Sequence, residues 1–208
     1  MSPIEHLVTS GTFSLDGGTW EVDNNVWLVG DDREVLLIDP AHDAEAIAEM
    51  VGDRRVTAIV CTHAHDDHIN QAPVLSRRFN APVMLNPAEA VLWKLTHPDH
   101  QPDGELSDEQ ILTVAGIDLH VLSTPGHSPG SACLHIPELE TVFTGDTLFQ
   151  GGPGATGRSY SSFDTIIESI GRTLLALPGE TIVHTGHGGS TTIGAEAPHL
   201  EEWIARGH

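Results

Sequence analysis

Residues 61–70, CTHAHDDHIN, place three histidines and two aspartates within six positions, directly after a short apolar run. Charged side chains this close repel one another and add nothing to a hydrophobic core, so a folded chain tolerates them only where something binds them. Imidazole and carboxylate groups are ligands for zinc and other first-row metals. The stretch therefore predicts a metal centre around which the rest of the chain must fold.

The length and composition of the chain limit the kinds of protein in which such a metal centre can lie. At 208 residues, without a linker or repeat, the chain is expected to form a single domain over residues 1–208. A formal net charge of −21 repels a phosphate backbone, which argues against a nucleic-acid partner. We see no signal peptide and no apolar run near the roughly 20 residues that span a bilayer, so we expect no membrane association. Cys61 and Cys133 lie in apolar segments and are expected to be buried free thiols, which fits the cytoplasm.

Hydrophobic patterning predicts two groups of strands with helices around them. Strands are expected at 6–13, 24–30, 33–40, 56–61 and 81–86, and then at 111–116, 117–124, 131–137, 140–145 and 181–186. Helices are expected at 43–52, 69–80, 87–96, 163–177 and 197–208, and the polar stretch 97–110 is expected to be a loop. This arrangement indicates an α/β fold in which helices cover the outer faces of the sheets.

Four of these strands end in candidate metal ligands. The first is followed by His63, His65, Asp67 and His68, and the other three by His127, Asp146 and His187. Ligands of α/β proteins collect at the carboxyl ends of strands, so these four ends are expected to converge. Glycines beside the last three positions allow the backbone to turn tightly there. The other nine histidines lack this context and are not expected to bind metal.

The side chains divide into two ligand sets. The expected sets are His63, His65 and His127 for one ion, and Asp67, His68 and His187 for the other. Asp146 has two oxygens and is expected to bridge the ions, which lie roughly 3.5–4 Å apart in paired catalytic sites. Asp39 ends another apolar strand and is expected to orient a ligating imidazole through a hydrogen bond.

These motifs resemble those of the metallo-β-lactamase superfamily over almost the whole chain. The H-x-H-x-D-H motif, TPGHSPGS, FTGDTLF and TGHG occur in the order typical of that family. The resemblance implies an αββα sandwich, with two mixed β-sheets, helices on the outer faces and the metals at one edge between the sheets. The segments GPGATGRSYSSF and GHGGSTTIGAE resemble the glyoxalase II-like (hydroxyacylglutathione hydrolase-like) branch, in particular its single-domain members.

The ligands separate the branches of this family. The best-known β-lactamases carry cysteine where this chain has Asp146, and flavodiiron oxidases carry glutamate in place of His65. Nucleases of the family usually add a clamp domain or an arm, for which this chain has no room. The resemblance therefore implies a hydrolase of small-molecule thioesters. Because the chain stops at His208, the C-terminal helical domain that grips glutathione in typical members is expected to be absent, and mycothiol is an equal candidate.

The expected reaction uses a hydroxide that bridges two divalent ions, zinc or else iron or manganese, and attacks the thioester carbonyl. Asp67 and Asp146 are the expected catalytic carboxylates, because Asp67 can orient the nucleophile and Asp146 contacts both ions. Arg158 and Tyr160 follow the Asp146 turn and are expected to bind substrate, with Arg158 pairing with a carboxylate.

Two other reactions fit the same residues. A mononuclear Fe(II) persulfide dioxygenase would use His63, His127 and Asp146 as its facial triad of two histidines and a carboxylate. A lactonase would use much the same ligands as the thioester hydrolase. The hydrolase is the preferred hypothesis; every residue of the second ligand set is present, although many of those dioxygenases retain these residues too.

Overall fold

The computed structural model of the protein describes residues 3–207, which form two six-stranded sheets. The first sheet contains, in spatial order, β1 (Ile4–Leu15), β2 (Gly18–Gly30), β3 (Glu34–Ile38), β4 (Arg55–Val60), β5 (Val83–Leu85) and β6 (Gly104–Glu105). The second contains, in spatial order, β14 (Thr191–Thr192), β13 (Ile182–Thr185), β10 (Thr141–Gly145), β9 (Ala132–Ile136), β8 (Ile117–Ser123) and β7 (Ile111–Val114). Both sheets are mixed, with β3–β6 parallel in the first and β10 parallel to β13 in the second. A small ribbon pairs β11 (Leu148–Phe149) with β12 (Gly152–Pro153).

The helices begin and end at residues suited to those positions. They are α1 (Ala44–Val51), α2 (Asp66–Ile69), α3 (Ala72–Phe79), α4 (Ala90–Thr96), α5 (Phe163–Ser169), α6 (Ile193–Glu196) and α7 (Leu200–Arg206). Asp43 caps α1 by accepting the N–H groups of Glu45 and Ala46, and Gly52 ends it with a φ of 62°. Three-residue 3₁₀ turns span Pro87–Glu89, Pro137–Leu139 and Ala197–His199. No helix within residues 3–207 is long and apolar enough to cross a membrane.

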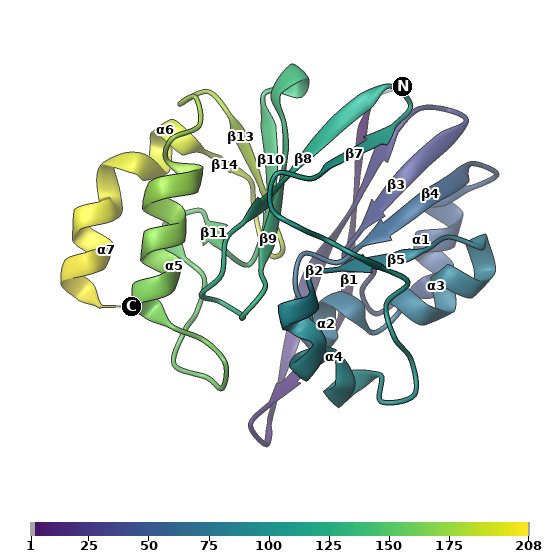
Figure 1. Ribbon diagram of the computed structural model, residues 1–208, viewed down its shortest axis with the longest axis horizontal. Helices are drawn as coiled ribbons and strands as arrows, with labels where there is room; N and C mark the ends of the chain where they lie inside the picture. The colour runs from purple at the N-terminus through teal and green to yellow at the C-terminus, as the bar shows by residue number, and fades with distance from the viewer. Residues whose placement is uncertain (1–2, 208) are drawn as a thin grey trace.

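The elements stack in four layers, helix on sheet on sheet on helix (Figure 1). Helices α1 and α3 cover the first sheet, and their Ile47 and Leu75 pack with Leu37 of β3 in one buried core. A second core lies between the sheets, and a third lies between the second sheet and α5 and α7. Each sheet therefore buries both faces, which confirms the predicted αββα sandwich. Cys61 and Cys133 are buried and free, as predicted.

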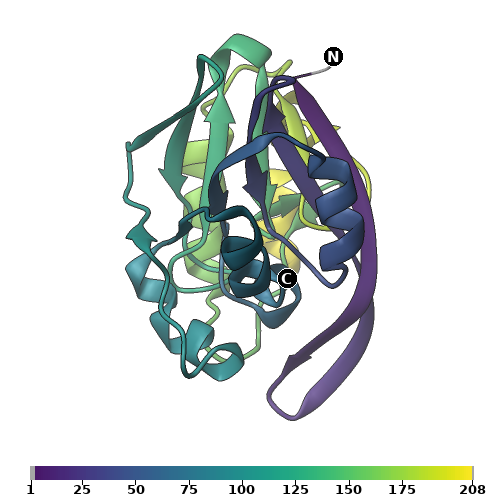
Figure 2. The same ribbon diagram turned by 90° about the vertical axis from the view of Figure 1, so that its right-hand side faces the viewer.

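The first two strands form a much longer hairpin than the expected segments 6–13 and 24–30. They pair from Ile4 to Leu15, and the hairpin tip projects beyond the body of the molecule (Figure 2). Asp16 and Gly17 make the turn with φ values of 54° and 78°. The polar residues near the tip mostly face solvent, while Phe13 and Trp20 stack across the two strands with ring centres 5.7 Å apart. Residues 19–23, TWEVD, alternate polar and apolar side chains as a strand does, but the expected segments did not include them.

Three smaller expectations were also wrong. The helix expected over 69–80 begins at Ala72, because Pro73 fits the first turn of a new helix, and α2 precedes it separately. The helix expected over 163–177 ends at Ser169 and continues as a π-helical turn, Ile170–Leu174. The loop 97–110 contains the short strand β6, which pairs with β5 through its backbone.

Asn25 joins the two sheets at the edge where the candidate ligands lie. Its backbone N–H donates to Gly186 O at 2.8 Å, and its side-chain amide donates to the carbonyl oxygens of Thr185 at 3.0 Å and Gly188 at 2.9 Å. Trp27 Nε1 adds a bond to Thr185 O at 3.2 Å. These buried bonds hold β2 of one sheet against the end of β13 in the other, so the loops that follow the strands face one another.

Gly126 gives a direct test of this packing. Its φ of 134° is disfavoured for other residues, and a Cβ there would lie 2.2 Å from Ile166 N of α5. We expect Gly126→Ala to lower the free energy of unfolding by about 1–3 kcal/mol or more, measured by denaturant titration. Gly179→Ala is the control, because its Cβ would meet nothing closer than 3.6 Å. Equal unfolding midpoints for the two variants would contradict the described packing.

Candidate metal centre

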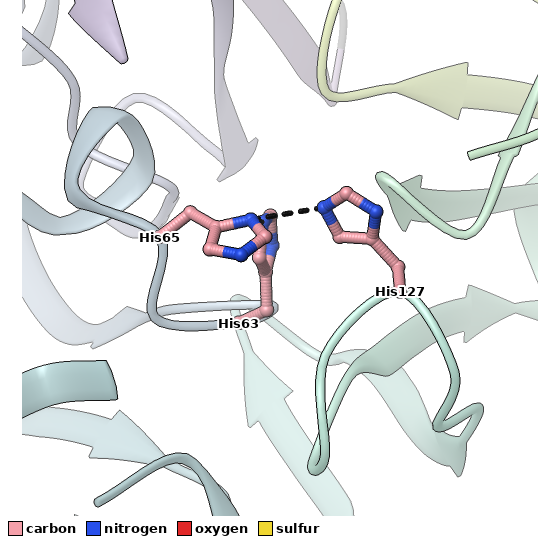
Figure 3. Close-up of side chains that lie close together, drawn as sticks. All are labelled: His63, His65 and His127. Carbon is pink, nitrogen blue, oxygen red and sulfur yellow. Dashed lines mark hydrogen bonds between the residues drawn. The ribbon is translucent and has the colours of Figure 1, made fainter. Parts of the chain in front are cut away.

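All seven predicted ligands come together at one edge of the sandwich. They arrive on four loops, which follow β4, β8, β10 and β13. Six are at most 9% exposed, and the side chain of His187 is 25% exposed. Figure 3 shows His63 and His65 on one loop facing His127 on another. The convergence expected from the strand ends is thus observed.

The three histidines of the first set point their ring nitrogens at a common position. His65 Nδ1 lies 3.1 Å from His63 Nε2 and 2.9 Å from His127 Nε2. Zinc bound tetrahedrally at 2.0–2.1 Å separates neighbouring nitrogen ligands by roughly 3.3 Å. The cluster therefore has the composition and nearly the spacing of a divalent-metal site, needing only a few tenths of an ångström of expansion.

The second ligand set also has the composition and spacing of a divalent-metal site. His187 Nε2 lies 3.2 Å from His68 Nε2 and 3.3 Å from Asp67 Oδ2. His68 Nε2 lies 3.6 Å from the same Asp67 oxygen. The mixture of two imidazoles and a carboxylate at these distances also fits a divalent first-row ion.

Asp146 lies between the two sets. Its Oδ1 is 3.3 Å from His68 Nε2, and its Oδ2 is 3.5 Å from His127 Nε2 and 3.4 Å from His187 Nε2. Oδ1 is buried without a hydrogen-bond partner, which is costly for a carboxylate unless a cation lies against it. A Cβ at Gly186 would lie 2.2 Å from this oxygen, so only glycine leaves room for it.

Charge is distributed unequally over the cluster. Burial lowers the pKa of His65 to about 3, and burial likewise lowers the pKa values of His63 and His127. Burial also disfavours the charged form of His187, but Asp146 outweighs it and raises the pKa of His187 to about 10. Asp146 and Asp67 similarly raise the pKa of His68 against its burial. Without metal, protonation is therefore favoured at the two histidines of the second set and disfavoured at the three histidines of the first.

Three of the five histidines are held in place by a contact of the ring nitrogen that faces away from the cluster. Asp39 lies 3.1 Å from His68 Nδ1 and accepts bonds from the Thr62 N–H and hydroxyl, both at 2.7 Å. His127 Nδ1 donates to Ala155 O at 2.8 Å, and His187 Nδ1 donates to Asp23 O at 2.7 Å. These bonds direct the Nε2 atoms of the three rings toward the cluster. Asp39 occupies the orienting position predicted for it.

Asn24 is a buried partner of the second set that the sequence analysis missed. Its amide nitrogen donates to Asp67 Oδ2 at 3.0 Å, and its Oδ1 lies 2.8 Å from His42 Nε2. His42 thus contacts the network without being a ligand candidate. The available signal was the pair of asparagines at the start of an otherwise apolar strand segment, where an unpaired amide would be costly to bury.

A cavity of about 250 Å³ opens onto the cluster. Besides cluster residues it is lined by Phe13, Trp20, Val22, Ala155, Arg158 and Ser161. The Arg158 guanidinium carbon lies over the Trp20 ring, 3.9 Å from its centre, so the side chain packs against the hairpin. Tyr160, predicted beside it to face the site, does not line this cavity, and its side chain is 49% exposed.

The hairpin tip is attached on both sides of the cavity. Ser14 N donates to Asp66 Oδ1 at 3.0 Å, beside the ligand loop, and Ser159 N donates to Asp16 Oδ2 at 2.9 Å. Phe13 packs against His65 with ring centres 5.0 Å apart. The long β1–β2 hairpin therefore forms one wall of the site, which the shorter strands expected from the sequence did not include.

Removing the shared carboxylate tests the ligand assignment. Asp146→Ala takes a ligand from both sets and leaves the two ions less compensated, so we expect loss of at least one of the metals that the wild type binds. Metal content after zinc loading and desalting is the measurement. Asp164→Ala, an exposed carboxylate in the first turn of α5, is the control. Full metal retention by Asp146→Ala would show that the assignment is wrong.

The protonated second set predicts proton release on metal loading. The raised pKa values of His68 and His187 favour their protonated forms at neutral pH without metal, and a ring nitrogen must lose its proton to coordinate, so loading should release protons. Metal affinity should consequently rise with pH through the neutral range. Calorimetric titration in buffers of different ionisation enthalpy counts the protons, and His187→Ala should release fewer. Release of none would contradict this charge distribution.

Comparison with known proteins identifies the family. Residues 19–187 match the family model of the metallo-β-lactamase superfamily. The chain is 33% identical over 181 residues to hydroxyacylglutathione hydrolase GloC of Haemophilus influenzae, covering 80% of this chain and 85% of that protein. It is 32% identical over 184 residues to the probable metallo-hydrolase YqgX of Bacillus subtilis, covering 82% and 87%.

Two solved structures agree over most of their length. The di-iron-bound form of TTHA1623 superposes with a TM-score of 0.75 and 33% identity, covering 85% of this chain and 93% of that one. The B3 metallo-β-lactamase BLEG-1 superposes with a TM-score of 0.79 and 30% identity, covering 92% and 98%. Fold, ligand cluster and family match agree: the chain belongs to the metallo-β-lactamase superfamily.

Proposed function

We propose that the protein is a metal-dependent hydrolase that cleaves thioesters of low-molecular-weight thiols, of the S-acyl-glutathione or S-acyl-mycothiol type. The observation that carries the proposal is the pair of complete ligand sets sharing Asp146 at the floor of a cavity. The likeness to a relative named hydroxyacylglutathione hydrolase supports the substrate class.

The residues fit two divalent cations, zinc or the iron or manganese that the same donors accept. Such ions, when bound, acidify water and polarise a carbonyl group. Asp67 lines the cavity, and the Asn24 amide fixes its carboxylate, so Asp67 is placed to orient an attacking water. Asp146 is held at the junction of the two sets and keeps them at a constant separation.

The lining of the cavity suits a thiol leaving group. Thiols ionise with a pKa of about 8.5, so a thiolate departs without a strong general acid. Outside the ligand cluster, the described lining residues are apolar or aromatic apart from Arg158 and Ser161, and none is a carboxylic acid. An amide or an alkyl ester, whose leaving groups are stronger bases, would gain less from this site.

Arg158 gives the cavity its one cationic side chain among the described lining residues outside the ligand cluster. Its guanidinium stacks on Trp20 and makes no hydrogen bond to any residue within 3–207, so its N–H donors remain available. A guanidinium in this state pairs well with a carboxylate. We therefore propose that the acyl or thiol part of the substrate carries a carboxylate that reaches Arg158.

An assay with and without oxygen separates the proposed hydrolase from the dioxygenase alternative. An S-lactoyl or S-formyl thiol conjugate should release free thiol at the same rate under nitrogen and air, because hydrolysis involves no redox change. A persulfide dioxygenase based on His63, His127 and Asp146 would consume oxygen only when given a persulfide. Rapid persulfide-dependent oxygen uptake without thioester cleavage would refute the proposal. Cleavage of a lactone or a β-lactam without thioester cleavage would replace the proposed substrate class.

Removing the Arg158 cation tests the substrate contact. Arg158→Ala should lower kcat/KM roughly 10- to 100-fold for thioesters that carry a carboxylate, since hydrogen bonds to charged groups contribute about 1.5–3 kcal/mol. The effect should be small for a substrate whose carboxylate is esterified. Arg172→Ala, which removes an exposed arginine paired with Glu168, is the control. Equal losses on both substrates would mean that Arg158 acts on packing rather than on the carboxylate.

A further inference from the structure

Glu89 is a buried carboxylate that neither ligand set uses. It ends the 3₁₀ turn Pro87–Glu89, just before α4, and none of its surface is exposed. It does not line the cavity. A carboxylate in such a place is costly unless its oxygens accept strong hydrogen bonds, so its partners define what it does.

Three donors converge on the Glu89 carboxylate. Oε2 accepts the backbone N–H of Ala64 at 2.7 Å, and Oε1 accepts the Ser128 hydroxyl at 2.6 Å and the Gly130 N–H at 2.5 Å. All three bonds are buried, where hydrogen bonds to a charged acceptor are strong. The two oxygens thus bind two different loops.

Those loops carry the whole first ligand set. Ala64 lies between His63 and His65, and Ser128 directly follows His127. The distance from His65 Nδ1 to His127 Nε2 across the loops is 2.9 Å, so small loop movements change the geometry of the set. Glu89 is therefore bonded to the backbone on both sides of the gap that a metal has to span.

Other bonds between the loops lie further from the ligands. Ala132 N donates to Thr62 O at 2.9 Å, which joins the bases of the two loops. Ser128 and Ser131 bond each other within one loop. Within residues 3–207, Glu89 is the side chain that bonds both to the peptide between His63 and His65 and to the His127 loop.

Both oxygens of the Glu89 side chain must be hydrogen-bond acceptors to bind the two loops. The Ala64 and Gly130 N–H groups can only donate, and a glutamine has one acceptor oxygen in place of two. A glutamine of the same shape would therefore turn an NH₂ group toward one of these N–H groups. The two donors would repel, and one loop would have to move.

We propose that Glu89 is a positioning residue that fixes the spacing between the His63–His65 loop and His127, and thereby sets the affinity of that ligand set for a divalent cation. The inference uses the ligand sets of the proposed function but not its substrate. Thioester cleavage could fail while the Glu89 effect on metal binding holds, and the reverse is equally possible.

The test compares zinc binding by Glu89→Gln and Glu196→Gln with the wild type. Glu196 is a matched control because it is 3% exposed and accepts bonds from Gly151 N at 3.0 Å and the Thr191 hydroxyl at 2.6 Å, away from both sets. Zinc affinity is measured by competition with a chromophoric chelator. For Glu89→Gln we expect a roughly 10- to 100-fold loss at one of the two zinc equivalents, and wild-type affinity at the other.

A merely structural role gives a different result. In that case Glu89→Gln would lower the unfolding temperature of the metal-free protein, as Glu196→Gln would, but the folded fraction would bind both zinc ions with wild-type affinity. That result would overturn the proposal. If Glu89→Gln does not fold, Ser128→Ala removes one of the three bonds, and it should weaken the same equivalent by a smaller factor. An unchanged zinc affinity in Ser128→Ala would then overturn it.

Discussion

The structure depends on the burial of seven ionisable side chains at a single edge of the sandwich. Burying charges is unfavourable unless they are paired, and here five imidazoles surround Asp67 and Asp146. Without metal, protons on His68 and His187 balance the carboxylates, and divalent ions can take their place. The same cluster thus accounts for the folding constraint on the loops and for the chemistry of the site.

The two-sheet fold supplies what this cluster requires. Mixed sheets stacked face to face bring the ends of β4, β8, β10 and β13 to the same edge, and Asn25 bonds the first sheet to the end of β13 in the second. The ligands are then fixed from outside by Asp39, by backbone carbonyls and by Asn24. Arg158 and the β1–β2 hairpin line the cavity with a cation and two aromatic rings.

The sequence predicted the ligands because each follows an apolar strand, and strand ends meet at one edge of a sheet. It could not predict contacts that depend on tertiary packing. Glu89 looks like an ordinary residue of a helical segment, and only the fold shows its carboxylate between two loops. The far end of the hairpin was not predicted, although residues 19–23, TWEVD, alternate polar and apolar side chains as a strand does. Tyr160 was expected at the site because it follows the Asp146 turn, but its backbone has a φ of 70° and the residue is about half exposed, outside the cavity.

The central claim is that both ligand sets hold metal at the same time, with Asp146 between them. Elemental analysis of protein purified without chelator tests this most directly, because it does not depend on the substrate or on the identity of the ion. We predict close to two equivalents of divalent metal per chain, whether zinc, iron or manganese. A reproducible single equivalent of iron, unchanged when further metal is offered, would contradict the account.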